Sequence, residues 1–335
     1  LGANTTGDDN ASFGNGSLLV NTTGFQNTAV GRAAMDSNTT GSLNASLGYT
    51  SLQKNTTGTN NTGLGHSALR ANTTASNNTA VGYNSLLANT TGTRNVALGA
   101  SALDANTVGD KNVAIGMDAL GTNVDGSRSV AVGDSALAAQ DPASAVEMYN
   151  TAVGHAAGTA VTTGVRNALI GGLAGDALTT GDDNTAVGSF SLSADTLGNR
   201  STAIGHNALA VQNFTSSTSV YNTAVGYAAG AAVTTGVLNT LVGGLSGDAL
   251  TSGNNNVAVG YLALSADTLG DRNVAIGNSA LTAQNFTSST DSYNTAVGFT
   301  AGASVTTGTQ NTLIGGLAGD ALTTGSSNVA VGYGA

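Results

Sequence analysis

The feature that most constrains this chain is a glycine that recurs at every seventeenth position over nearly its whole length. It follows an apolar residue in motifs such as NTAVG at 78–82. The interval is longer at only three steps, where extra residues lie in 140–149, 211–221 and 283–293. Self-similarity at a fixed period indicates a repeat architecture with one structural unit, here called a rung, per repeat. The periodic glycines are Gly14, Gly31, Gly48, Gly65, Gly82, Gly99, Gly116, Gly133, Gly154, Gly171, Gly188, Gly205, Gly226, Gly243, Gly260, Gly277, Gly298, Gly315 and Gly332.

The content of each rung indicates β-structure. The β-branched NTAV run is broken by Asn-Thr-Thr-Gly, whose residues favour turns, and Glu and Lys, which favour helices, are nearly absent. Apolar residues make up 40% of the chain at regular intervals, which disfavours disorder. We therefore predict an all-β fold, a parallel β-solenoid or β-roll of about 19 rungs stacked at about 4.8 Å, with room for two short strands per rung.

The insertions divide this continuous solenoid. The part at 1–149 forms uninterrupted 17-residue rungs that end in the first insertion. The part at 150–335 forms long super-repeats of four rungs each, at 150–221, 222–293 and, in part, 294–335. Leu1 and Ala335 are consecutive in the rung pattern, and neither end carries a polar cap. We expect this chain to be a segment of a longer one.

The alternation of side chains within NTAVG suggests a contact between chains. We place the Val inside the rung, so that the preceding Ala faces outward. Small residues there favour close packing against another chain, although they could simply suit a pleated turn. Ordering 17 backbones costs on the order of 17–34 kcal/mol, and two buried apolar side chains return roughly 3–6 kcal/mol. Asn and Thr ladders and burial against partner chains would supply the rest, so we expect a homo-oligomer, in particular a trimer. The residues predicted at the inter-chain contact are Ala80, Ala97, Ala114, Ala131, Ala224, Ala258 and Ala296.

The unit N-[TV]-A-[VI]-G-x-x-A-L occurs at Asn112–Leu120 and Asn273–Leu281. It resembles the YadA-like, or haemagglutinin-type, head repeats of trimeric autotransporter adhesins, and the resemblance covers the whole chain. The resemblance implies a left-handed parallel β-roll, three chains around one axis, and display on a bacterial surface to bind host matrix or cells. Similar repeats occur in phage tail fibres. The period here is longer than in the family's heads because a turn such as Asn-Thr-Thr-Gly at 55–58 is inserted in the repeat.

Aromatic residues are the candidates for contact with a partner. One group directly follows the periodic glycine and would line one edge of the solenoid, where it could contact a sugar or a protein, cover a turn, or seal the contact between chains. A second group lies in or closes the insertions, and loops on a rigid scaffold often carry recognition. The first group is Tyr49, Tyr83, Tyr227, Tyr261, Phe299 and Tyr333, and the second is Tyr149, Phe214, Tyr221, Phe286 and Tyr293.

The sequence contains no catalytic constellation, so we predict no enzymatic activity and no cofactor or metal centre. His66, His155 and His206 lie on non-adjacent rungs and could not share a metal ion. Calcium at the turns Asp8-Asp9 and Asp182-Asp183 stays open as an alternative. The net charge of −10 disfavours nucleic acid, and no stretch approaches the ~18 apolar residues of a membrane span.

These features together predict a structural extracellular fibre or adhesin segment, a rigid rod at a cell or particle surface that attaches to a surface receptor, matrix protein or glycan. The first alternative is a tail fibre or receptor-binding fibre of a phage or injection particle. An ice-binding solenoid and a glycan-cleaving spike are further alternatives.

Overall fold

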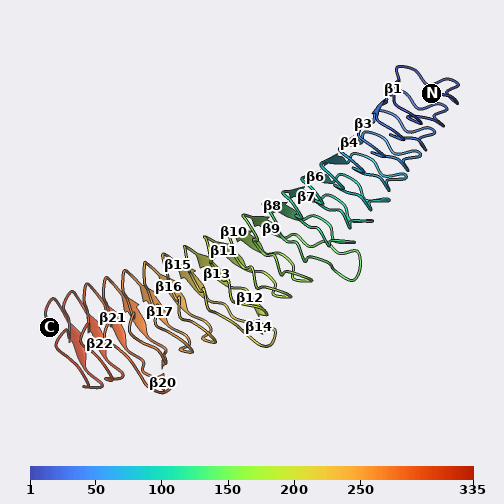
Figure 1. The fold of residues 1–335 in the computed structure, drawn as a ribbon. Helices are drawn as coiled ribbons and strands as arrows, with labels where there is room; N and C mark the ends of the chain where they lie inside the picture. The colour runs from blue at the N-terminus through green and yellow to red at the C-terminus, as the bar shows by residue number, and fades with distance from the viewer. The chain divides into compact units, whose positions relative to one another are not determined.

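The computed structural model describes residues 1–335, which form β-strands and turns with no helix (Figure 1). Each rung contributes one short strand that pairs in parallel with the equivalent strand of the next rung. In one such pair, Ala80 lies beside Ala97, and Val81 beside Leu98. The prediction of an all-β parallel solenoid with 17-residue rungs is therefore confirmed.

The chain forms two compact units, and the first spans Leu1–Arg166. It holds nine rungs, and its strands pair in chain order. The strands are β1 (Ala11–Phe13), β2 (Thr28–Val30), β3 (Ala45–Leu47), β4 (Thr62–Leu64), β5 (Thr79–Val81), β6 (Val96–Leu98), β7 (Val113–Ile115), β8 (Val130–Val132) and β9 (Thr151–Val153).

The second unit spans Asn167–Ala335 and holds ten rungs. Two of its rungs carry an additional two-residue strand that pairs with the following insertion, β12 with β14 and β18 with β20. The rung strands are β10 (Ala168–Ile170), β11 (Thr185–Val187), β13 (Thr202–Ile204), β15 (Thr223–Val225), β16 (Thr240–Val242), β17 (Val257–Val259), β19 (Val274–Ile276), β21 (Thr295–Val297), β22 (Thr312–Ile314) and β23 (Val329–Val331). The additional strands are β12 (Gly198–Asn199), β14 (Thr218–Ser219), β18 (Gly270–Asp271) and β20 (Thr290–Asp291).

Most rungs therefore have one strand where the sequence had room for two. The remainder of the rung turns at residues in the left-handed region, such as Asn84 (φ 56°), Leu86 (φ 49°) and Arg94 (φ 59°). These corners interrupt extended structure, because a strand needs successive residues in the β region. Successive rungs still bond through their backbones at the corners, as where the Leu86 amide donates to the Ala102 carbonyl at 3.0 Å.

The interior of each rung combines one large apolar side chain with buried asparagines. Leu52 and Leu86 are fully buried, as are Asn38 and Asn55. The Asn38 side-chain amide donates to Asn21 Oδ1 of the previous rung at 2.8 Å and to the Gly41 carbonyl at 2.9 Å. The predicted Asn ladder is thus confirmed, and it satisfies polar groups that burial would otherwise penalise.

The periodic glycine is required by both backbone conformation and space. Gly48 has φ 144°, and a Cβ there would lie 2.2 Å from the Gly65 carbonyl oxygen of the next rung. No L side chain fits this approach, which explains the strict period.

Some rungs exchange large and small residues within the interior. Gly247 replaces the usual core Leu, and a Cβ on it would meet Leu241 Cδ2 at 2.8 Å and Leu250 Cδ1 at 2.9 Å. Both leucines are fully buried. They fill the space that the missing side chain leaves, so the core keeps its volume while its residues change position.

Candidate functional site

The first and third residues of the rung strands form a surface that we call the outer sheet face. It carries no charged residue, because its first positions hold Thr, Val or Ala and its third positions Val, Ile, Leu or Phe. Leu47 and Leu98 are 47% and 46% exposed. A hollow of about 220 Å³ lies on this face at β3 and β4 and includes Leu47 and Leu64 in its lining. In each unit this face is an uncharged surface, with a column of large apolar side chains beside a column of Thr, Val and Ala, and it has no partner within the chain.

The predicted inter-chain contact at the strand alanines is wrong. All seven are fully buried inside the chain, namely Ala80, Ala97, Ala114, Ala131, Ala224, Ala258 and Ala296. The reason is the narrow interior at this position. A Cβ on Gly63 would lie 2.5 Å from Ser51 Oγ and 3.3 Å from Leu52 Cγ, so only small side chains suit the middle of a strand there. Side chains alternate as expected, but the aliphatic residue faces outward.

The residues that directly follow the periodic glycines form a second surface, which we call the ring column. Its aromatic members are about half exposed or more, namely Tyr49, Tyr83, Tyr227, Tyr261, Phe299 and Tyr333. Where successive rungs carry rings, the rings stack on each other. Tyr49 and His66 have centroids 5.1 Å apart, and His66 and Tyr83 are 5.3 Å apart. Arg32 extends this stack with its guanidinium carbon 5.7 Å from the Tyr49 ring.

The insertions are fastened to the preceding rung by arginine. Arg128 lies over Tyr149, Arg200 over Tyr221 and Arg272 over Tyr293, at 5.5–5.6 Å from each ring centroid. Each guanidinium also donates a hydrogen bond to the hydroxyl of the same tyrosine. The three tyrosines remain about half exposed. Their rings are therefore accessible at the edge, while one face is covered by arginine.

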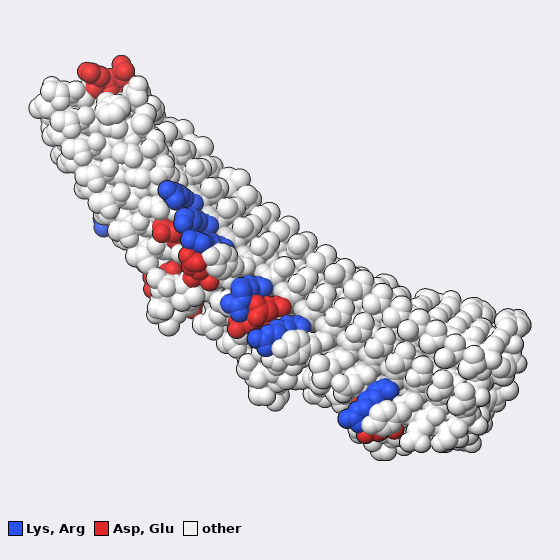
Figure 2. All heavy atoms as spheres, turned by 180° about the vertical axis from the view of Figure 1, so that it is seen from behind, with Lys and Arg blue, Asp and Glu red and all other residues white.

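In two of the insertions an acidic side chain also forms an ion pair with the arginine. Arg128 pairs with Glu147 at 2.7 Å, and Arg272 pairs with Asp291. The Asp291 carboxylate raises the pKa of Arg272, whose side chain is 44% exposed. Figure 2 shows basic side chains in short groups beside acidic ones, with most of the visible face uncharged. This arrangement leaves no extended basic surface on that face.

Phe214 and Phe286 do not offer the contact surface that the sequence suggested. They are 7% and 6% exposed, because each packs into its insertion. The Phe214 amide lies 3.4 Å from the buried Asp195 carboxylate, which also accepts from Gln212 at 2.6 Å. These phenylalanines therefore anchor the insertions. Among the aromatic residues of the insertions, only the tyrosines at the ends are exposed.

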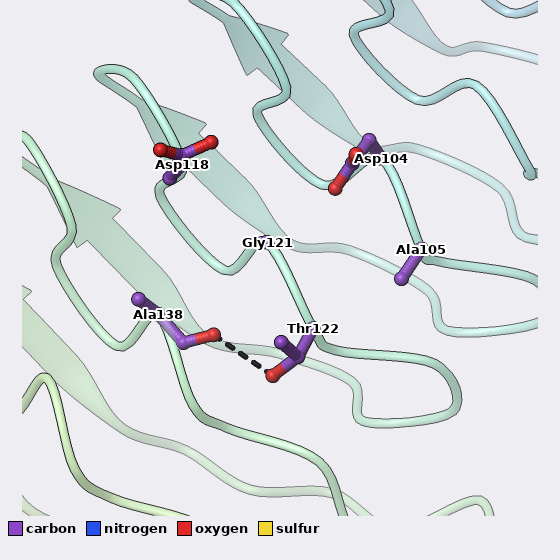
Figure 3. A pocket seen from close by; sticks show the side chains of 6 residues that line it. All are labelled: Asp104, Ala105, Asp118, Gly121, Thr122 and Ala138. Carbon is purple, nitrogen blue, oxygen red and sulfur yellow. Dashed lines mark hydrogen bonds between the residues drawn. The ribbon is translucent and has the colours of Figure 1, made fainter.

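A shallow cavity of about 420 Å³ lies beside rungs of the first unit (Figure 3). Its lining includes Asp104 and Asp118, and Gly121 leaves part of it without a side chain. Thr122 Oγ1 closes one edge by donating to the Ala138 carbonyl at 2.8 Å. Burial raises the pKa of Asp104, and the charge of Asp118 adds to that rise. Two carboxylates form the only ionisable lining of this cavity.

No group of three or more His, Asp or Glu side chains is placed to hold a metal ion. His66 and His206 lie in ring stacks, the latter 5.7 Å from the Tyr227 ring, and His155 lies 3.6 Å from Asp134. The three histidines are thus parts of the exposed column of each unit.

Comparison of the chain with the profiles of known families, with characterised proteins and with solved structures finds no match. The resemblance to adhesin head repeats rests on the repeated sequence motif alone. No helix of the structure has the length and apolar content needed to cross a membrane.

Proposed function

We propose that this chain is a non-enzymatic segment of an extracellular fibre, in which copies of the solenoid associate through the outer sheet face and present the ring column and insertions for attachment. The observation that carries this proposal is the apolar surface of the strands. Large uncharged apolar surfaces on soluble proteins commonly mark sites of association.

The size of the outer sheet face fits such an association. A three-residue strand is about 10 Å long and rungs are about 4.8 Å apart, so each rung presents roughly 50 Å². The nine rungs of the first unit give on the order of 430 Å² and the ten of the second on the order of 480 Å², so each unit supplies about half of the ~800 Å² per partner of a standard interface. In a trimer each chain would divide this face between its two neighbours around a common axis. Three copies is the number that the resemblance implies, and we propose a trimer at a cell or particle surface.

The solenoid suits a structural role for a further reason. Within each unit, every rung is bonded to the next by a strand pair and by corner backbone bonds, and in many rungs the asparagine ladder adds to these, so bending is resisted at each step. Rigid presentation of loops and rings is the property that an attachment fibre needs. The partner proposed for these surfaces is a surface receptor, matrix protein or glycan.

The test is the solution mass of the chain and of two charge-matched variants. Leu64→Glu with Leu98→Glu places two charges on the outer sheet face, where both leucines are exposed. Thr57→Glu with Thr91→Glu places the same charges on exposed turns. Light scattering should give three times the 32.4 kDa chain mass for the wild type and the turn variant, and a single chain for the leucine variant. A wild-type chain that stays at 32.4 kDa at all concentrations would refute the proposal.

A further inference from the structure

The ring column of the second unit contains two gaps, each a glycine between two rings. Gly244 lies between Tyr227 and Tyr261, and Gly316 lies between Phe299 and Tyr333 in the same arrangement. We call each of these triads an aromatic slot. Elsewhere the column holds side chains as large as tyrosine and arginine, and its third glycine, Gly172, is followed by Ser189, so only Gly244 and Gly316 lie between two aromatic rings.

Neither glycine is required by the fold. Gly244 and Gly316 lack the positive φ of the periodic glycines. A Cβ on Gly244 would meet Tyr261 Cδ2 at 3.6 Å, and one on Gly316 would meet Tyr333 Cδ2 at 3.5 Å, which are ordinary van der Waals contacts. Backbone conformation and space would both accept a side chain. With no side chain at either glycine, the only side chain that reaches over it is the ring of the following rung, Tyr261 or Tyr333.

The width of a slot follows from the stacks that the column forms elsewhere. Adjacent stacked rings have centroids 5.1–5.7 Å apart. Rings two rungs apart are separated by about 10 Å, twice the rung spacing, when each ring lies level with its own rung, which in the slots requires Tyr261 and Tyr333 to swing away from the glycines. A six-membered ring inserted midway would lie about 5 Å from each aromatic ring, within the roughly 4.5–7 Å range of favourable ring contacts. An occupied slot would reproduce the continuous stack of Tyr49, His66 and Tyr83.

The surroundings favour a neutral ring with polar edges. No charged residue occurs in 225–228, 242–245 or 259–262 around the first slot, nor in 297–300, 314–317 or 331–334 around the second. Half-buried Leu245 and Leu262 follow the first slot, while the hydroxyls of Tyr227 and Tyr261 lie at the ends of exposed rings. A neutral pyranose has C–H groups on its faces and hydroxyls around its edge, which matches apolar walls with phenol groups.

We propose that the two aromatic slots each bind one neutral pyranose ring of a glycan chain flat between two aromatic side chains. The proposal rests on the attachment function proposed above and names the chemistry of its ligand. The slots are four rungs apart, about 19 Å along one unit. A glycan with repeated rings can occupy both, and the second binding event then benefits from a high effective concentration.

The experiment measures binding of neutral hexasaccharides of glucose, galactose, mannose and N-acetylglucosamine to the whole chain by calorimetry and saturation-transfer NMR. Gly244→Tyr with Gly316→Tyr fills both slots with rings that the column already accommodates. The control is Ala100→Tyr, which adds a ring beside Tyr83 in the same column. We expect at least one of the four sugars to bind the wild type and the control, a loss of at least tenfold in affinity for the filled variant, and intermediate affinity for Gly244→Tyr alone.

Several results would overturn this inference. They are no binding of any neutral hexasaccharide by the wild type, equal affinity of the filled variant, or binding only of a peptide that carries aromatic residues. Tyr261→Ala is the second variant, because it removes a wall of the slot without adding bulk, and unchanged affinity there would also contradict the inference. Light scattering on the same samples separates the two proposals, since self-association that persists without sugar binding refutes the slots alone.

Discussion

The asparagine ladder gives the sharpest test of what holds the rungs together. Asn55 is fully buried, and its side-chain amide donates to Asn38 Oδ1 at 2.8 Å and to the Gly58 carbonyl at 3.0 Å. Its own oxygen accepts from Asn72 at 2.8 Å. Asn55→Ala removes all three bonds. The Gly58 carbonyl keeps a bond from Asn44, but Asn38 Oδ1 is left buried without a partner.

The expected loss of stability follows from the number of hydrogen bonds that the substitution removes. At about 1 kcal/mol for each lost bond, Asn55→Ala should lower the free energy of unfolding by about 3 kcal/mol, with the orphaned oxygen adding to it. The assay is urea denaturation followed by far-ultraviolet circular dichroism, with the slope compared between variants. The control is Thr57→Ala, two positions along on the exposed turn, which should stay within about 0.5 kcal/mol. A loss below about 1 kcal/mol for Asn55→Ala would refute the ladder as a source of stability.

Three further predictions use matched changes. Ala97→Val overfills the interior and should cost about 1–3 kcal/mol, whereas Ala45→Val on the outer sheet face should stay within about 0.5 kcal/mol, both by urea denaturation. Gly48→Ala, at φ 144° and against a carbonyl, should cost at least about 2 kcal/mol, while Gly244→Ala should be nearly neutral by thermal melting. Burial raises the pKa of Asp195 from its ordinary 3.8, so the stability it contributes is complete below pH 3.8 and is lost as the pH rises through the folded-state pKa. Asp195→Asn should remove that part of the pH dependence, and an unchanged stability–pH curve would contradict the assignment.

The period and the class of fold were predictable because they depend on local signals. The glycine repeat, the β-branched run and the Asn-Thr-Thr-Gly turn each act within one rung, and the register follows once one rung stacks on the next. The compensation at Gly247 was also visible, since Leu250 appears three positions later. Because every rung must fill the same interior volume, comparing the repeats within this one sequence shows where a lost side chain is replaced by another.

The direction in which each strand faces was not predictable by the same means. Alternation fixes which residues share a face but leaves open which face is inside, so one wrong choice inverts every strand. The choice depends on the distance from Gly63 to Ser51 and Leu52 across the rung, which the local pattern does not encode. A strand that buries its small residue and exposes its aliphatic one is unusual, and the usual preference for buried aliphatic residues favoured the wrong face.

The candidate contact residues were predictable in part, for similar reasons. The ring column follows directly from the period, because every residue after a periodic glycine occupies an equivalent place. Phe214 and Phe286 lie in insertions without a repeat of their own, and the burial of Phe214 depends on partners such as Asp195 and Gln212. The glycines Gly244 and Gly316 could not be predicted as parts of a binding site, because that inference needs the stacking distances of rings in the column.

The central claim is that copies of this chain meet at the outer sheet face, and site-specific cross-linking tests it most directly. The chain has no cysteine, so Leu98→Cys introduces a single thiol on that face and Thr91→Cys a single thiol on a nearby exposed turn. With a short bis-maleimide, the Leu98→Cys chain should yield covalent dimers while the Thr91→Cys chain stays single. Equal cross-linking at the two positions, or none at Leu98→Cys in a sample that light scattering shows to be oligomeric, would contradict the account.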